Sequence, residues 1–206
     1  MDPKYRITAG LIGTLGVAAL LAQFGLLLGQ GVGVLAALWF LAGFFTILTN
    51  ALMAATMLRI AVTGQRLSYG WMSMVTLSMI MVGLVYHALL AQFVVFTGLR
   101  WWVDHALHTI LPAAMLWFWL METTRHDPRE GQPLTWLIWP ALYAVYGMTR
   151  GLVSGRFLYP FFNVEALGWP AVGLNLAGFL MAFLALAYLL NALGRAMPLR
   201  DQRASR

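Results

Sequence analysis

A polar cluster interrupts an apolar run at "FFTILTN", residues 44–50. Thr46 and Asn50 are four residues apart and share a face if the segment is helical, and Thr49 adjoins them. Side chains of these types commonly form hydrogen bonds between helices in membranes, and Thr also bonds to its own main chain. The cluster therefore serves either packing or a reactive site.

A second cluster lies in "WWVDHALHTILP", residues 101–112. On a helix, Asp104 and His108 are about one turn apart, and His105 is three residues from His108. Pro112 has no N–H to donate to the carbonyl group of His108, so we expect the helix to be disturbed there. Such a disturbance opens space beside a histidine.

Together the two clusters provide the groups that acyl transfer requires. The hydroxyl of Thr46 is a poor nucleophile until a base, usually a neutral imidazole, takes its proton. Burial disfavours the charged imidazolium and would keep His108 able to accept that proton. Asp104 is placed to hold the other ring nitrogen, and the Asn50 amide is a candidate donor to an oxyanion. Buried polar groups that only tie helices together are the alternative interpretation.

Metal or haem binding is another use of buried histidines. Zinc takes three or four ligands, whereas here two histidines share one segment and His87 stands alone in another. Cysteine is absent, which excludes Cys-based metal sites and disulfides. We therefore expect no metal and no cofactor.

The composition indicates the class of protein in which these clusters lie. The chain has 206 residues, of which 61% are hydrophobic and 10% charged, whereas a soluble domain has about 25% charged residues. We expect an all-α, polytopic membrane protein with a single domain. The net charge is +6, but the basic residues are spread thinly between apolar runs, which argues against a nucleic-acid partner.

Membrane-crossing helices need about 20 predominantly apolar residues. Charged residues, Gly and Pro, and polar clusters divide the sequence into apolar segments. These segments predict a bundle of six transmembrane helices, followed by a short basic tail at residues 195–206. The six predicted spans are residues 6–28, 33–58, 69–97, 101–121, 134–153 and 170–193.

The basic residues predict the orientation of these spans. With a cytoplasmic N-terminus, ten of them fall on the cytoplasmic side and three on the other side, as expected if positive charge stays inside. We therefore expect both termini to be cytoplasmic. The ten are Lys4, Arg6, Arg59, Arg66, Arg125, Arg129, Arg195, Arg200, Arg203 and Arg206, and the three are Arg100, Arg150 and Arg156.

An aromatic segment, "RFLYPFFNV" (residues 156–164), follows the fifth predicted span. Its rings suit the membrane interface, and Pro160 opposes a regular helix. We expect the segment either to anchor the chain at the interface or to cover the mouth of a cavity.

Three motifs, "FFTILTN", "HALHTILP" and "YPFFNVEALGW", occur in this order and resemble one family. It is the androgen-induced protein and androgen-dependent TFPI-regulating protein family, including its bacterial branch. The animal members are integral-membrane threonine hydrolases that cleave fatty-acid esters of hydroxy fatty acids with a Thr nucleophile and a His partner. Compared with them, the histidine pair here lies one residue closer to the following proline, and "TILTN" has the Thr/Asn pattern of the bacterial branch.

The resemblance implies that Thr46 is the nucleophile and His108 its partner, with a supporting role for His105. It implies a hydrolase of a bacterial plasma membrane that acts on membrane lipids or lipid esters. A non-catalytic lipid-binding membrane protein is the main alternative, and a haem-binding or transport protein is a further one. The resemblance does not extend to the substrate or to the oligomeric state.

Overall fold

The computed structural model describes residues 3–93, 95–123 and 132–197, and these residues form an all-α fold, as predicted. Shorter helical turns, labelled η, connect or interrupt the α-helices. The α-helices are α1 (Pro3–Leu28), α2 (Val34–Leu41), α3 (Phe45–Thr63), α4 (Tyr69–Val85), α5 (Gly98–His105), α6 (Leu111–Glu122), α7 (Ile138–Ser154) and α8 (Val164–Ala196). The π-helical turns are η1 (Tyr86–Leu90) and η3 (Ala106–Ile110), and the 3₁₀ turns are η2 (Ala91–Phe93), η4 (Pro133–Leu137) and η5 (Pro160–Phe162).

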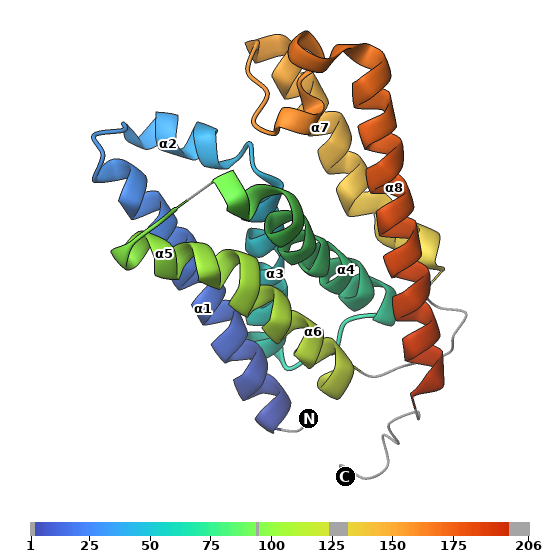
Figure 1. Ribbon diagram of the computed structural model, residues 1–206. Helices are drawn as coiled ribbons and strands as arrows, with labels where there is room; N and C mark the ends of the chain where they lie inside the picture. The colour runs from blue at the N-terminus through green and yellow to red at the C-terminus, as the bar shows by residue number, and fades with distance from the viewer. Residues whose placement is uncertain (1–2, 94, 124–131, 198–206) are drawn as a thin grey trace.

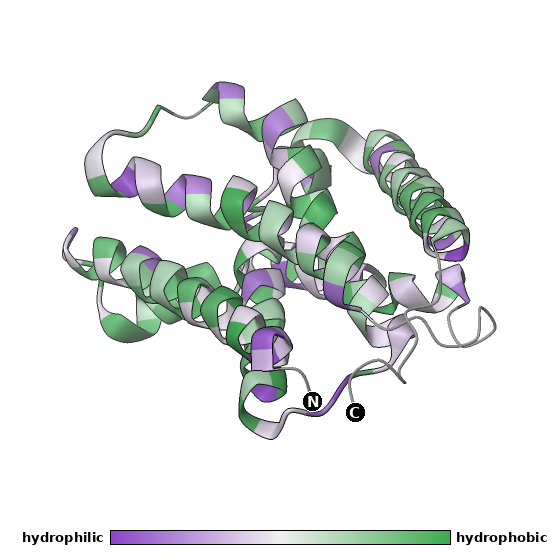
Figure 2. Cartoon of the chain, turned by 90° about the horizontal axis from the view of Figure 1, so that it is seen from below, coloured by the Kyte–Doolittle hydropathy of each residue, from purple (hydrophilic) through white to green (hydrophobic). Residues whose placement is uncertain are grey.

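Within the described residues, four helical segments are long and apolar enough to cross a membrane, which indicates a membrane protein. They are Pro3–Leu28, Phe45–Thr63, Tyr69–Phe93 and Val164–Ala196. Apolar residues dominate the helices in Figure 2, and many face outward: Leu11 is 68% exposed and Leu174 is 75% exposed. Outward apolar surface of this extent suits contact with lipid.

Six spans are not confirmed, because two of the predicted segments are not among these four. The segment 134–153 corresponds mainly to α7, which has 17 residues. The segment 101–121 corresponds to α5, η3 and α6, where polar residues and a π-helical turn interrupt the apolar run. Most of the predicted basic tail, from residue 198 onward, lies outside the described residues.

The second predicted span, residues 33–58, is wrong as a single helix. α2 ends before the break at residues 42–44, and α3 then runs in a different direction (Figure 1). A Cβ atom on Gly43 would lie 2.1 Å from the Cδ1 atom of Leu158, so the Leu158 side chain packs directly against the main chain of the break. A segment more than a hundred residues away in the sequence therefore contacts the break.

Helix α7 stabilises this break. A helix end leaves main-chain carbonyl groups without partners inside the helix. Three side chains on one face of α7 donate hydrogen bonds to carbonyl groups at the end of α2 and just beyond it. Tyr143 donates to Gly43 (2.7 Å), Tyr146 donates to Ala42 (3.0 Å), and Arg150 donates to Trp39.

The core lies around α4, which contacts α3, α6 and α8, while α1 packs along α3. The side chains of Met79 and Trp119 are fully buried there. In Figure 1, α7 and α8 stand beside this group and are joined at one end by η5. α1 begins and α8 ends at the same end of the molecule (Figure 1).

Candidate functional site: a buried threonine on an apolar cavity

Thr46 is the second residue of α3 and follows directly on the break after α2. Its side chain is almost buried, at 9% exposure. The first N–H groups of a helix have no acceptor inside the helix, and the N-terminal end carries partial positive charge. Because the chain breaks before Phe45, Thr46 lies at such an end and not in the middle of a span.

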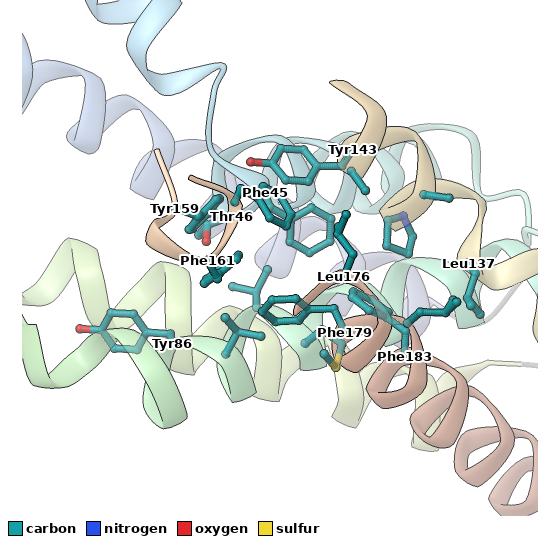
Figure 3. A pocket seen from close by; sticks show the side chains of 18 of the residues that line it. Phe45, Thr46, Tyr86, Leu137, Tyr143, Tyr159, Phe161, Leu176, Phe179 and Phe183 are labelled. Carbon is teal, nitrogen blue, oxygen red and sulfur yellow. The ribbon is translucent and has the colours of Figure 1, made fainter. Parts of the chain in front are cut away.

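Thr46 lines an apolar cavity of about 150 Å³ that has an open mouth. An apolar cavity of about this volume binds a group the size of benzene. The wall is formed by α3, α4, η1, η4, α7, η5 and α8, and its polar side chains are those of Thr46, Tyr86, Tyr143 and Tyr159 (Figure 3). The cavity can therefore hold an apolar group near a hydroxyl.

The aromatic segment expected after the fifth span contributes to this cavity. Tyr159, Phe161 and Phe162 all line it. The segment therefore forms part of the cavity wall, and its predicted position over the cavity mouth at the membrane interface stays a prediction.

Tyr159 lies next to Thr46 on the cavity wall (Figure 3). Burial raises the pKa of the Tyr159 phenol, and this effect is larger than the opposite effect of the neighbouring side chain and main chain of Thr46. The sequence gives Tyr159 no role beyond that of the aromatic segment, because its place beside Thr46 depends on the packing of distant helices.

The predicted pairing of Asp104 with His108 is present. The Nδ1 atom of His108 lies 3.1 Å from Oδ1 of Asp104 and 3.0 Å from the main-chain oxygen of the same residue. The other carboxylate oxygen accepts a hydrogen bond from Tyr86, whose ring stacks on His108 with 4.0 Å between centroids. The sequence does not predict the bond of Tyr86 to Asp104, because the two residues lie on different helices.

Both Tyr86 and His108 lie in π-helical turns, η1 and η3. The disturbance expected before Pro112 takes the form of η3. The main-chain oxygen of His108 lies close to Gly83, where a Cβ atom would be only 3.1 Å away. Short π-helical turns inside α-helices are frequent at functional sites. The two turns also join through His87, whose Nε2 atom lies 2.9 Å from Oγ1 of Thr109.

His105 contacts the cluster more weakly than the sequence predicts. Its ring stacks on Trp101 with 3.8 Å between centroids, and its Nδ1 atom bonds to the main-chain oxygen of the same residue. The shortest approach to the Asp104 carboxylate is 3.9 Å. His105 therefore adds positive charge near Asp104 only when it is protonated.

Asn50 is fully buried and connects the two clusters. Its side-chain nitrogen donates to the main-chain oxygens of Thr46 (2.8 Å) and Leu107 (3.2 Å). Both amide hydrogens are thus in use, and the side chain has no hydrogen left for an oxyanion. The geometry favours a structural role in which Asn50 holds α3 against η3. The neighbouring Thr49 accepts a hydrogen bond from Trp139 and serves packing.

The structure brings the candidate residues together as two groups. Thr46 and Asn50 form one, and Asp104 and His108 form the other. Asn50 joins the groups through Leu107, and Tyr86 joins them by lining the cavity and stacking on His108. Within the described part of the chain, no hydrogen bond links Thr46 directly to His108, and His108 is not on the cavity wall.

Metal binding finds no support in the arrangement of ligands. Among the described residues, no three His, Cys, Asp or Glu side chains come together in a way that could hold a metal ion. The histidines of the site instead bond to a carboxylate, a hydroxyl and main-chain carbonyl groups.

The fold and the cavity define the class: an all-helical membrane protein in which an apolar cavity reaches a buried threonine. No protein-family model matches the chain, and no curated protein or solved structure shows significant similarity to it. The residues of the site and the motifs of the sequence therefore remain as the indications of function.

Proposed function

We propose that this protein is an integral-membrane lipid-ester hydrolase with Thr46 as its nucleophile, related to the androgen-induced family that its motifs resemble. The observation that carries this proposal is the position of Thr46. Thr46 lies on the wall of a cavity that is otherwise nearly apolar and has an open mouth. A fatty-acid ester bound with its chain in the cavity presents its carbonyl group to the Thr46 hydroxyl.

His108 is the proposed general base. The bond from Nδ1 to the Asp104 carboxylate orients the ring and leaves Nε2 as the nitrogen that accepts a proton. Proton transfer needs a shorter approach of His108 to Thr46 than the structure has without substrate. Catalytic hydrogen bonds are often long in the free enzyme and tighten when substrate binds. The hydrogen bonds of Asn50 keep the two helices in register for that approach.

For the membrane topology we propose six crossings, with the second assigned to α3 in place of residues 33–58. The helical stretches 98–122 and 133–154 are two further crossings, in addition to the four long apolar helices. α2 lies near the surface of the membrane. An even number of crossings agrees with α1 beginning and α8 ending at the same end of the molecule. The bias of the basic residues places that end in the cytoplasm, as expected for a bacterial plasma-membrane protein.

A lipid-binding protein without catalytic activity is the second candidate. The observation that favours it is the cavity wall, where apolar side chains greatly outnumber polar ones. In this case Thr46 and Tyr159 would bond to the polar end of a bound lipid without reacting with it.

Activity-based labelling separates the two candidates. Purified wild-type protein should react covalently with a fluorophosphonate probe and hydrolyse p-nitrophenyl laurate. Thr46→Ala and His108→Ala should each abolish both reactions, and the double variant should lose little more, because nucleophile and base act as a unit. Thr46→Ser keeps the hydroxyl and should retain activity.

Thr49→Val is the matched control, because it removes a buried hydroxyl one turn away that does not line the cavity. It should label and turn over like the wild type. If folded Thr46→Ala protein hydrolysed the ester at the wild-type rate, Thr46 would be a packing residue and the lipid-binding candidate would be preferred.

A further inference from the structure

Tyr159 lies beside the proposed nucleophile. It is 8% exposed and lines the same cavity next to Thr46 (Figure 3). It belongs to the segment between α7 and α8, far from Thr46 in the sequence. Its position is therefore a product of the fold.

Aromatic packing fixes the ring of Tyr159. Phe161 stacks on it with 5.0 Å between centroids and an angle of 14° between the rings. Phe44 and Tyr143 contact it edge-on, at 6.0 Å and 6.4 Å. Phe44 is the N-cap residue of α3, so these contacts hold the phenol against the first turn of that helix. A donor fixed before the reaction costs no reorganisation when charge develops.

The other polar groups near Thr46 have their hydrogens committed elsewhere. Both amide hydrogens of Asn50 go to main-chain oxygens. The hydroxyl of Tyr143 donates to Gly43, and that of Tyr86 donates to Asp104. The neighbouring groups of Thr46 and Phe45 lower the pKa of Tyr159, as donors to its phenol oxygen do, and they therefore do not take up its hydrogen. Tyr159 is thus the side chain on the cavity wall best able to donate to a substrate.

We propose that Tyr159 is a catalytic residue that donates a hydrogen bond to the carbonyl oxygen of the ester attacked by Thr46. This inference rests on the proposed hydrolase function and adds to it the group that stabilises the oxyanion. Positive charge at the start of α3 acts in the same direction.

The reaction is balanced without net transfer of the Tyr159 proton. As Oγ1 of Thr46 bonds to the carbonyl carbon, the π electrons move onto the carbonyl oxygen, and the threonine proton passes to His108. The hydrogen bond from Tyr159 strengthens as that oxygen becomes negative. Collapse of the intermediate then breaks the ester C–O bond, and the alcohol leaves with the proton from His108. Water releases the acyl group from Thr46 by the same steps.

The environment keeps Tyr159 in the form that this role requires. Burial raises the pKa of its hydroxyl above the ordinary value, so the group remains protonated and able to donate at neutral pH. A phenolate would instead repel the developing oxyanion.

The test compares the kcat and KM of Tyr159→Phe with those of the wild type on p-nitrophenyl laurate. The variant keeps the stacked ring and loses only the hydroxyl. We expect kcat to fall about 10²- to 10³-fold with little change in KM, as for removal of one oxyanion donor. Tyr188→Phe is the control, because Tyr188 is 53% exposed on α8 and does not line the cavity. It should keep the wild-type kcat, and thermal unfolding should show that both variants are folded.

The outcomes separate this inference from the function on which it rests. If Thr46→Ala is inactive while Tyr159→Phe keeps the wild-type kcat, or changes KM alone, Tyr159 is a packing residue and the hydrolase assignment stands. An inactive wild type, or an active Thr46→Ala, overturns both.

Discussion

Asp104 and His108 contact each other across one helical turn, with Nδ1 of His108 lying 3.1 Å from Oδ1 and 3.0 Å from the main-chain oxygen of Asp104. The second carboxylate oxygen accepts a hydrogen bond from Tyr86, a residue of another helix. The carboxylate therefore has a fixed direction and in turn fixes the imidazole ring. Such a relay sets which nitrogen of a histidine carries its proton.

Replacement of Asp104 by Asn tests this relay. An amide can hold the ring in place, but it no longer favours the tautomer with the proton on Nδ1 or stabilises the imidazolium. We expect kcat for ester hydrolysis to fall about 10²- to 10⁴-fold, with fluorophosphonate labelling slowed in parallel. Tyr86→Phe removes only the outer hydrogen bond and should have a smaller effect. Equal rates for Asp104→Asn and the wild type would exclude His108 as an Asp-assisted base.

Asn50→Ala distinguishes a structural role from an oxyanion role. The variant removes the bond that joins α3 to the main-chain oxygen of Leu107. We expect a loss of about 1–3 kcal/mol in the free energy of unfolding, which a lowered Tm in detergent would reveal. Below the Tm, kcat should fall by less than the roughly 10²-fold or more expected for loss of an oxyanion donor. A large fall in kcat without a change in Tm would restore Asn50 as the oxyanion donor.

Filling the cavity should change the preference for acyl-chain length. Ala144 lines the cavity, whereas Leu142, on the same helix, is 60% exposed on the outer surface. In Ala144→Phe, the ratio of kcat/KM for p-nitrophenyl laurate to that for p-nitrophenyl butyrate should fall at least about tenfold, because a longer chain no longer fits. Leu142→Phe adds a ring outside the cavity and should leave the ratio unchanged. A fall in both variants would show that the ratio does not report on the cavity.

Cysteine labelling tests the proposed topology. Gln30 follows α1, and Gln132 precedes η4; both side chains are exposed. With six crossings, cysteines at these two positions lie on opposite sides of the membrane. An impermeant maleimide applied to sealed right-side-out vesicles should label Gln30→Cys but not Gln132→Cys. If only the four longest apolar helices cross, the two positions lie on the same side and label alike.

Local spacing determined several features of this protein from the sequence alone. The composition indicated helices in a membrane, because so apolar a chain cannot cover its surface with polar groups. The contact of Asp104 with His108 and the bond from Asn50 to Thr46 also follow from the sequence, because residues four apart are neighbours on any helix. These features need no information about distant parts of the chain.

Tertiary structure decided the rest. The break before α3 looked like continuous helix in the sequence, because the groups that contact it, Leu158 and the donors on α7, lie in distant segments. The same break moves Thr46 from the middle of a predicted span to the start of a helix. The contact of Tyr159 with Thr46 and the cavity behind them depend on how α7 and α8 pack against α3 and α4. Helical periodicity specifies which residues share a face, but only packing specifies what that face meets.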